Sequence, residues 1–185
     1  MRTPHDIKRV AVLGAGLMGH GIALELAAHR RLVCLHDVSE QLLDKAIAHA
    51  RVGLKALHQA GLISFDEIEA SISRISTSLD LSETVEGTDL VIEAVSENLE
   101  LKHSLFDKVD RIAPAHAVLV SNTSTFLPSA LAAATQRPLQ FAGVHYYNPP
   151  HLLPGVEIIK GPETSDATVQ LLTGFYQMIG KRPAL

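Results

Sequence analysis

The sequence predicts an α/β fold, a doubly wound and mainly parallel sheet with helices on both faces. Short apolar runs without polar alternation are typical of strands that are buried on both sides. Segments with helical character separate these runs, as expected when helices connect parallel strands. Glycines follow the first run directly, which is typical of a tight strand-to-helix turn. At 185 residues, a single domain covering residues 1–185 is expected.

The first three elements form a strand–helix–strand unit. Residues 10–13 are a continuous apolar run and predict the first strand. Residues 17–29 carry large apolar residues among small ones, which predicts a helix that packs closely on the sheet. Residues 32–37 are again mostly apolar and predict the second strand. Because such crossovers are almost always right-handed, the two strands should lie parallel.

The same alternation continues along the rest of the chain. Apolar runs predict further strands at residues 74–78, 89–95, 117–121, 141–145 and 156–159. Helices are expected at residues 39–59, 65–73 and 99–112, in a short segment after Pro128, and at residues 166–179. Residues 181–184 resemble the beginning of another strand rather than a tail.

The composition argues against several classes of function. A formal net charge of −4 without a dense Lys/Arg run argues against a nucleic-acid partner, which needs a basic face. No apolar stretch is as long as a membrane span and no signal-peptide core opens the chain, so a cytoplasmic protein is expected. The histidines lack paired ligand spacing, so no metal site is expected. The lone Cys34 should be a small buried hydrophobe.

A glycine loop follows the first predicted strand. Gly14 permits the tight turn, Gly16 lets the backbone approach a pyrophosphate, and Gly19 lets the helix pack near the strand. The helix that begins at Leu17 and Met18 offers free N–H groups and a partial positive charge to phosphates. This context predicts a Rossmann-type, dinucleotide-binding domain.

Asp37 follows the second predicted strand, 18 residues beyond Gly19. An acid at this place can accept hydrogen bonds from the adenosine ribose hydroxyls and would repel a 2′-phosphate. The next residue is Val38 rather than an arginine, so NAD is expected in preference to NADP. The alternative interpretation is a turn glycine cluster with an Asp that caps the following helix.

Polar residues follow three later strands, at the edge where open parallel sheets bind ligands. They are Glu97, the Ser-Asn-Thr-Ser run at residues 121–124, and His145. Each has a simpler explanation, as a helix-terminal acid, a hydrogen-bonded turn or an ordinary histidine. Glu157 lies among apolar neighbours, where a carboxylate is costly unless paired. Paired with His145, it would form a general base.

At these residues the sequence resembles the L-3-hydroxyacyl-CoA dehydrogenase family over nearly the whole chain. The resemblance rests on the loop at residues 14–19, Asp37, residues 93–99 and 121–124, residues 145–149, and Glu157. It implies His145 as catalytic base, Glu157 as its partner, and Ser121 as a hydrogen-bonding group near the substrate oxygen and cofactor. It also implies that Glu97, Lys102 and Asn148 contact the nicotinamide half of NAD.

The resemblance further implies NAD-dependent oxidation of a 3-hydroxyacyl-CoA to a 3-ketoacyl-CoA in fatty-acid metabolism. In this family a C-terminal helical domain completes the cleft and forms a homodimer, and we expect that domain to lie outside these 185 residues. Without it, the isolated domain should bind NAD but turn over poorly.

Two features depart from the family pattern. The Ser and Lys that usually contact CoA map to Gly53 and Ala60, and residues 149–154 are closer to relatives that oxidise free 3-hydroxy acids, such as L-gulonate and carnitine dehydrogenases. A dehydrogenase of a free 3-hydroxy acid is therefore an alternative. A non-catalytic NAD-binding or crystallin-like structural protein is the alternative from another class.

Overall fold

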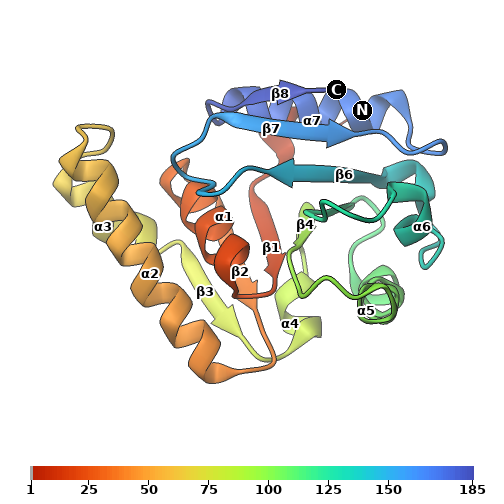
Figure 1. Cartoon of the computed structure of the whole chain (residues 1–185), viewed down its shortest axis with the longest axis horizontal. Helices are drawn as coiled ribbons and strands as arrows, with labels where there is room; N and C mark the ends of the chain where they lie inside the picture. The colour runs from red at the N-terminus through yellow and green to blue at the C-terminus, as the bar shows by residue number, and fades with distance from the viewer. Residues whose placement is uncertain (1) are drawn as a thin grey trace.

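The computed structural model describes residues 2–185 as one eight-stranded sheet covered by helices (Figure 1). The strands are β1 Arg9–Leu13, β2 Leu32–His36, β3 Ile75–Ser78, β4 Leu90–Glu93, β5 Val118–Ser121, β6 Phe141–Tyr146, β7 Gly155–Ile159 and β8 Arg182–Ala184. The α-helices are α1 Leu17–Ala28, α2 Glu40–Gln59, α3 Phe65–Ile72, α4 Leu81–Val85, α5 Leu99–Ile112, α6 Pro128–Ala132 and α7 Asp166–Met178.

The strand order is β3-β2-β1-β4-β5-β6-β7-β8. The first six strands run parallel, β7 pairs antiparallel with β6, and β8 runs parallel to β7. The order reverses between β1 and β4, which is the place where doubly wound sheets bind ligands. The predicted Rossmann-type fold is confirmed.

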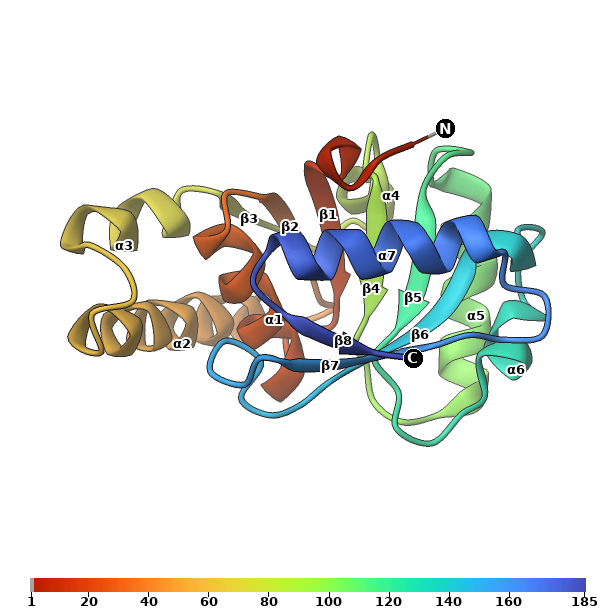
Figure 2. The same cartoon turned by 90° about the horizontal axis from the view of Figure 1, so that it is seen from above.

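Two apolar cores lie on opposite faces of the sheet. Val10 and Val12 of β1 point into a core shared with α1, α2 and α7, whereas Ala11 and Leu13 point into a core shared with α4, α5 and α6. Figure 2 shows α7 and α1 on one face and α5 on the other. Burial on both faces explains why β1 is apolar at every position from Val10 to Leu13.

Two local expectations differ from the structure. Helix α4 was not expected, because its five residues are too few to show a helical period; it is started by Asp80, whose carboxylate accepts from the N–H groups of Ser82 and Glu83. Cys34 is half-buried rather than buried. It lies on β2 beside Ser76 of β3, in a polar groove over these strands.

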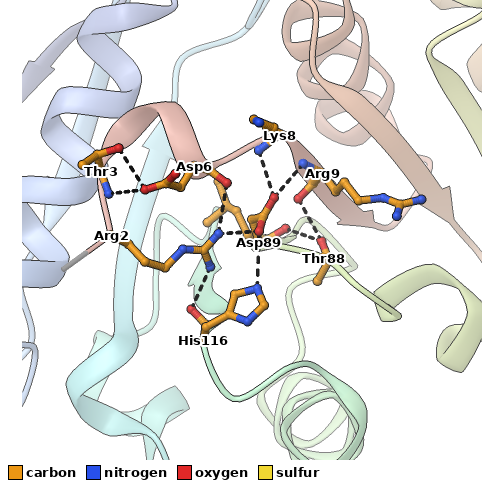
Figure 3. A network of polar contacts seen from close by, with 9 residues as sticks. Arg2, Thr3, Asp6, Lys8, Arg9, Thr88, Asp89 and His116 are labelled. Atoms are coloured by element: carbon orange, nitrogen blue, oxygen red, sulfur yellow. Dashed lines mark hydrogen bonds and ion pairs between the residues drawn. The ribbon is translucent and has the colours of Figure 1, made fainter.

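A polar network attaches the N-terminal segment to the amino ends of β1 and β4, whereas the glycine loop follows the carboxyl end of β1 (Figure 3). The Oδ2 atom of Asp89 accepts hydrogen bonds from the backbone N–H groups of Lys8 and Arg9, both at 2.9 Å. Its Oδ1 atom meets the Arg2 guanidinium and lies 3.3 Å from His116 Nε2. Burial acts to raise the pKa of Asp89, but these hydrogen bonds outweigh it and hold the pKa below its usual value.

Among the helices of residues 2–185, none combines the length and the apolar character needed to cross a membrane.

Candidate active site

A cleft of about 510 Å³ opens at the carboxyl ends of β1, β4, β5 and β6. It brings together seven of the site residues that the sequence singled out, from segments far apart in the chain. These are Gly16, Leu17, Met18, Glu97, Lys102, His145 and Asn148. The Lys102 side chain contributes little surface, since it is only 1% exposed. The cleft lies at the reversal of strand order, as the sheet topology requires.

The three loop glycines have different structural reasons. Gly14 has a φ of +103°, and a Cβ there would lie 2.6 Å from the backbone oxygen of Ala94. A Cβ on Gly19 would lie 1.7 Å from the Gly14 oxygen, so α1 could not approach β1 as closely. A Cβ on Gly16 would meet nothing within 4 Å. Gly14 and Gly19 are therefore required by packing, whereas Gly16 faces open space in the cleft.

The N-terminus of α1 is suited to an anion. Gly16 is its N-cap and provides no side-chain hydrogen bond, so the first N–H groups of the helix have no side-chain cap. Leu17 and Met18 carry these groups and line the cleft. The open space at Gly16 and the uncapped N–H groups together fit a pyrophosphate.

Asp37 lies just beyond β2 and is half-buried. Its Oδ2 atom accepts a hydrogen bond from the Ala15 N–H at 2.8 Å, and its Oδ1 atom accepts one from the Ser39 N–H at 3.2 Å. Asp37 thus shapes the glycine loop. Because each carboxylate oxygen can accept a second hydrogen bond, it also retains the capacity to bind ribose hydroxyls.

His145 and Glu157 form a pair across two antiparallel strands. The register of β6 and β7 places them directly opposite each other, and His145 Nδ1 donates to Glu157 Oε2 at 2.7 Å. This bond occupies Nδ1, and since His145 lines the cleft, Nε2 is the ring nitrogen left for a ligand there. The hydrogen bond from His145, together with one from Tyr147, holds the pKa of Glu157 below its usual value. Glu157 therefore remains a carboxylate at neutral pH.

The reason for this pairing differs from the one expected. The sequence suggested that Glu157 needs a partner because it is buried among apolar residues, yet its side chain is 43% exposed. Burial alternates along β7, whose outer neighbour β8 has only three residues. The strand register, and not the cost of burial, brings Glu157 to His145.

Beneath the cleft lies a buried carboxylate that sequence reasoning did not single out as a site residue. Glu93 ends β4 and is 0% exposed. Its Oε1 atom accepts hydrogen bonds from Lys102 Nζ at 2.6 Å and from the Val95 N–H at 2.8 Å, and its Oε2 atom accepts one from Ser121 Oγ at 2.5 Å. Ser121 is also 0% exposed and lies below the wall rather than on it. An acid inside the apolar run of β4 was the signal that could have revealed Glu93.

Glu97 projects from this buried group into the cleft. Its Oε2 atom lies 3.1 Å from Lys102 Nζ, and its Oε1 atom accepts a hydrogen bond from the Thr123 hydroxyl. Burial acts to raise the pKa of Glu97, but the hydrogen bond from Thr123 and the contact with Lys102 outweigh it, so the pKa lies below its usual value. The cleft wall thus carries an ionised carboxylate at neutral pH.

Asn122 and Asn148 complete the side of the cleft next to His145. Asn122 Oδ1 accepts a hydrogen bond from the Tyr146 N–H at 2.9 Å, which connects the end of β5 to the end of β6. Asn148 is exposed at the rim. In residues 2–185 no group of three or more His, Cys, Asp or Glu side chains is arranged to hold a metal ion.

Residues 9–185 match the family model described as 3-hydroxyacyl-CoA dehydrogenase, NAD binding domain. The chain is 41% identical over 182 residues to the mitochondrial hydroxyacyl-coenzyme A dehydrogenase of Rattus norvegicus, covering 96% of this chain and 58% of that protein. It is 38% identical over 175 residues to a probable 3-hydroxybutyryl-CoA dehydrogenase of Deinococcus radiodurans, covering 95% of this chain and 62% of that protein. The chain therefore spans about three fifths of these relatives' length.

Solved structures of two dehydrogenases share this fold over most of the chain. The 3-hydroxybutyryl-CoA dehydrogenase of Escherichia coli K12 superposes with a TM-score of 0.92 at 34% identity, over 96% of this chain and 38% of that one. The enzyme PaaH1 of Ralstonia eutropha, described as an (S)-3-hydroxybutyryl-CoA dehydrogenase, has a TM-score of 0.92 at 32% identity, over 96% of this chain and 62% of that one.

Proposed function

Because this chain belongs to the family of 3-hydroxyacyl-CoA dehydrogenase NAD-binding domains, we propose that it holds NAD in the cleft and serves the oxidation of a 3-hydroxyacyl-CoA to a 3-ketoacyl-CoA. One observation carries the proposal. His145, which Glu157 holds through a hydrogen bond, lines the same cleft as the uncapped N-terminus of α1. A base and a pyrophosphate site in one cleft are what a nicotinamide-dependent dehydrogenase needs.

The residues divide between the two halves of the cofactor. The N–H groups at Gly16, Leu17 and Met18 would hold the pyrophosphate. Asp37 would bind the adenosine ribose, and its charge would disfavour a 2′-phosphate. Glu97 and Asn148 would border the nicotinamide half, on the side of the cleft where His145 lies. When bound, NAD supplies a ring that accepts the hydride from C3 of the substrate.

The protein's own chemistry is proton transfer. His145 Nε2 would remove the proton from the 3-hydroxyl group as the carbonyl forms. Glu157 holds the Nδ1 side of the ring through its 2.7 Å hydrogen bond, so the ring orientation is set before substrate arrives. As a carboxylate, Glu157 would also stabilise the imidazolium that forms during the step.

A second candidate substrate is a free 3-hydroxy acid. The resemblance maps a CoA-contacting Ser of the family to Gly53 on α2. Here a Cβ at Gly53 would lie 2.7 Å from Leu24 Cδ2 and 3.3 Å from His151 Nε2. Leu24 and His151 therefore leave no room for a side chain at position 53, and this position offers no hydroxyl group to CoA.

The test uses the protein expressed from its natural gene, with whatever flanks these 185 residues. NADH formation is measured with 3-hydroxybutyryl-CoA and, separately, with free 3-hydroxybutyrate. We expect turnover of the CoA ester and a preference for NAD over NADP. Turnover of the free acid alone would establish the second candidate instead. Tight NAD binding without turnover of either substrate would indicate a non-catalytic NAD-binding protein.

Two parts of the proposal concern the whole protein. By analogy with the family, we propose a homodimer formed through a helical domain outside these residues. The cytoplasmic location expected from the sequence stays a prediction. The name of the rat relative includes a mitochondrial location. Light scattering of the natural gene product and microscopy of a tagged copy would test these two points.

A further inference from the structure

We propose that Glu93 is a positioning residue, which closes a buried ring of hydrogen bonds and thereby holds the Glu97 carboxylate against the nicotinamide half of the cofactor. This inference rests on the proposed function, because it assumes that NAD occupies the cleft. It goes beyond that function by assigning a role to a residue that touches neither cofactor nor substrate.

The ring is formed by five residues, through their side chains and one backbone N–H group. Glu93 contacts Lys102 at 2.6 Å, and Lys102 Nζ lies 3.1 Å from Glu97. Glu97 accepts a hydrogen bond from the Thr123 hydroxyl, and the Thr123 N–H donates to Ser121 Oγ at 3.3 Å. Ser121 donates back to Glu93 at 2.5 Å. The ring joins β4, β5 and the start of α5, so its geometry is set by the sheet and by one helix.

Only one member of the ring is well exposed to the cleft. The Glu97 side chain is 38% exposed, whereas Glu93 and Ser121 are 0%, Lys102 is 1% and Thr123 is 5% exposed. The buried members therefore act on a ligand through Glu97. This arrangement gives Ser121 a supporting role, where the resemblance alone implied direct contact, and it makes Lys102 both a support for Glu97 and a minor part of the cleft wall.

The protons of Lys102 and Ser121 also point to interactions within the ring. The Lys102 ammonium has three protons, and it has three acceptors within the protein, namely Glu93, Glu97 and the Val95 oxygen at 3.4 Å. The Ser121 hydroxyl has one proton, which goes to Glu93. The shortest contacts of both groups are therefore with Glu93, inside the protein.

The charge of the ring gives it a measurable function. The carboxylates of Glu93 and Glu97 and the ammonium group of Lys102 sum to one net negative charge. Glu97 is the member through which this charge is exposed to the cleft. A negative charge next to the nicotinamide attracts the positive ring of NAD⁺ but not the neutral ring of NADH. If Glu93 were neutral, Lys102 would pair with Glu97 alone and cancel its charge. Glu93 therefore favours the oxidised cofactor.

The test is Glu93→Gln, with binding measured by calorimetry at pH 8 for three ligands. We expect the Kd of NAD⁺ to rise about tenfold, because one charge is removed from a partly buried site. The Kd of NADH should rise by less than about threefold. ADP-ribose lacks the nicotinamide, so its Kd should not change.

Two further variants separate a positioning role from general damage. Glu25→Gln breaks another buried Glu–Lys pair, since Glu25 lies 3.0 Å from Lys181 outside the ring, and it should leave the ratio of NAD⁺ to NADH affinity unchanged. Thr123→Val removes the ring hydrogen bond to Glu97 without removing a charge, together with the bonds that the Thr123 hydroxyl accepts from the N–H groups of Thr125 and Phe126. This variant should raise the Kd of NAD⁺ more than the Kd of ADP-ribose. It provides the test if Glu93→Gln does not fold.

The outcomes distinguish this inference from the function on which it rests. Equal loss of affinity for all three ligands, or no loss for any of them in the ring variants, would overturn the role of Glu93. Failure of the unmodified protein to bind NAD⁺, NADH and ADP-ribose would overturn the proposed function itself.

Discussion

At the scale of single residues, the proposed chemistry depends on the hydrogen bond between the His145 imidazole and the Glu157 carboxylate. The bond between His145 Nδ1 and Glu157 fixes which ring nitrogen faces the cleft. The lowered pKa of Glu157 keeps the partner ionised at neutral pH. A histidine held in this way is oriented as a base before substrate binds.

His145→Gln should therefore remove turnover without removing the cofactor site. In the natural gene product we expect kcat to fall by about two to four orders of magnitude, the usual contribution of a general base. The Kd of NAD⁺ should change less than about twofold, since the pyrophosphate and ribose contacts are intact. His5→Gln, at an exposed position of the N-terminal segment, is the matched control and should keep full activity. Wild-type turnover by His145→Gln would refute the assignment.

At the scale of elements, the glycine loop combines a packing requirement with an open binding surface. Gly19 lets α1 approach β1. Gly14 adopts a positive φ and lets the loop backbone pass close to the backbone of Ala94. Gly16 lies between them and touches nothing at its Cβ position. A single motif thus contains two glycines that the fold requires and one that leaves open space, where we propose that the pyrophosphate binds.

Two alanine variants should separate these roles. Gly19→Ala places a methyl group 1.7 Å from the Gly14 oxygen, so it should lower the free energy of unfolding by about 3 kcal/mol or more. Gly16→Ala should cost less than about 1 kcal/mol but weaken NAD⁺ binding, because the methyl group enters the space intended for the pyrophosphate. Urea unfolding and calorimetry measure the two effects. Equal stability of the two variants would show that the loop is looser than this packing indicates.

At the scale of the whole molecule, Asp89 connects the N-terminal segment to the middle of the sheet. It precedes β4 and holds Arg2, Lys8 and Arg9 (Figure 3). These contacts lie at the amino ends of β1 and β4, and the cleft lies at the carboxyl ends of the strands. They should therefore influence stability and leave cofactor binding unaffected.

The stability of the protein should depend on pH through this carboxylate. Because the folded-state pKa of Asp89 is lowered, its stabilising contribution is complete above the unfolded value near 4 and is lost as the pH falls through the folded-state value. Asp89→Asn should cost about 1 to 3 kcal/mol at pH 7, and the difference from the unmodified protein should shrink below about pH 4. Asp44→Asn, at an exposed position of α2, is the control. A difference that stays constant from pH 7 to pH 3 would contradict this account.

The sequence by itself determined the strands and the longer helices, the glycine loop with Asp37, and the chemical match between His145 and Glu157. The elements and the loop are local features, since a buried parallel strand must be apolar throughout and a tight turn must contain glycine. The pairing could be inferred because two reactive side chains suit each other chemically.

Only the tertiary structure decided how the cleft wall is supported. The ring around Glu93 needs the register of β4 against β5 and the approach of Lys102 from α5, and no periodicity along the chain encodes either contact. The half-exposure of Glu157, the burial of Ser121 and the open groove at Cys34 likewise depend on which neighbouring element covers each position. Local patterns specify elements because they arise from adjacent residues, whereas this wall arises from side chains that meet only after the sheet has assembled.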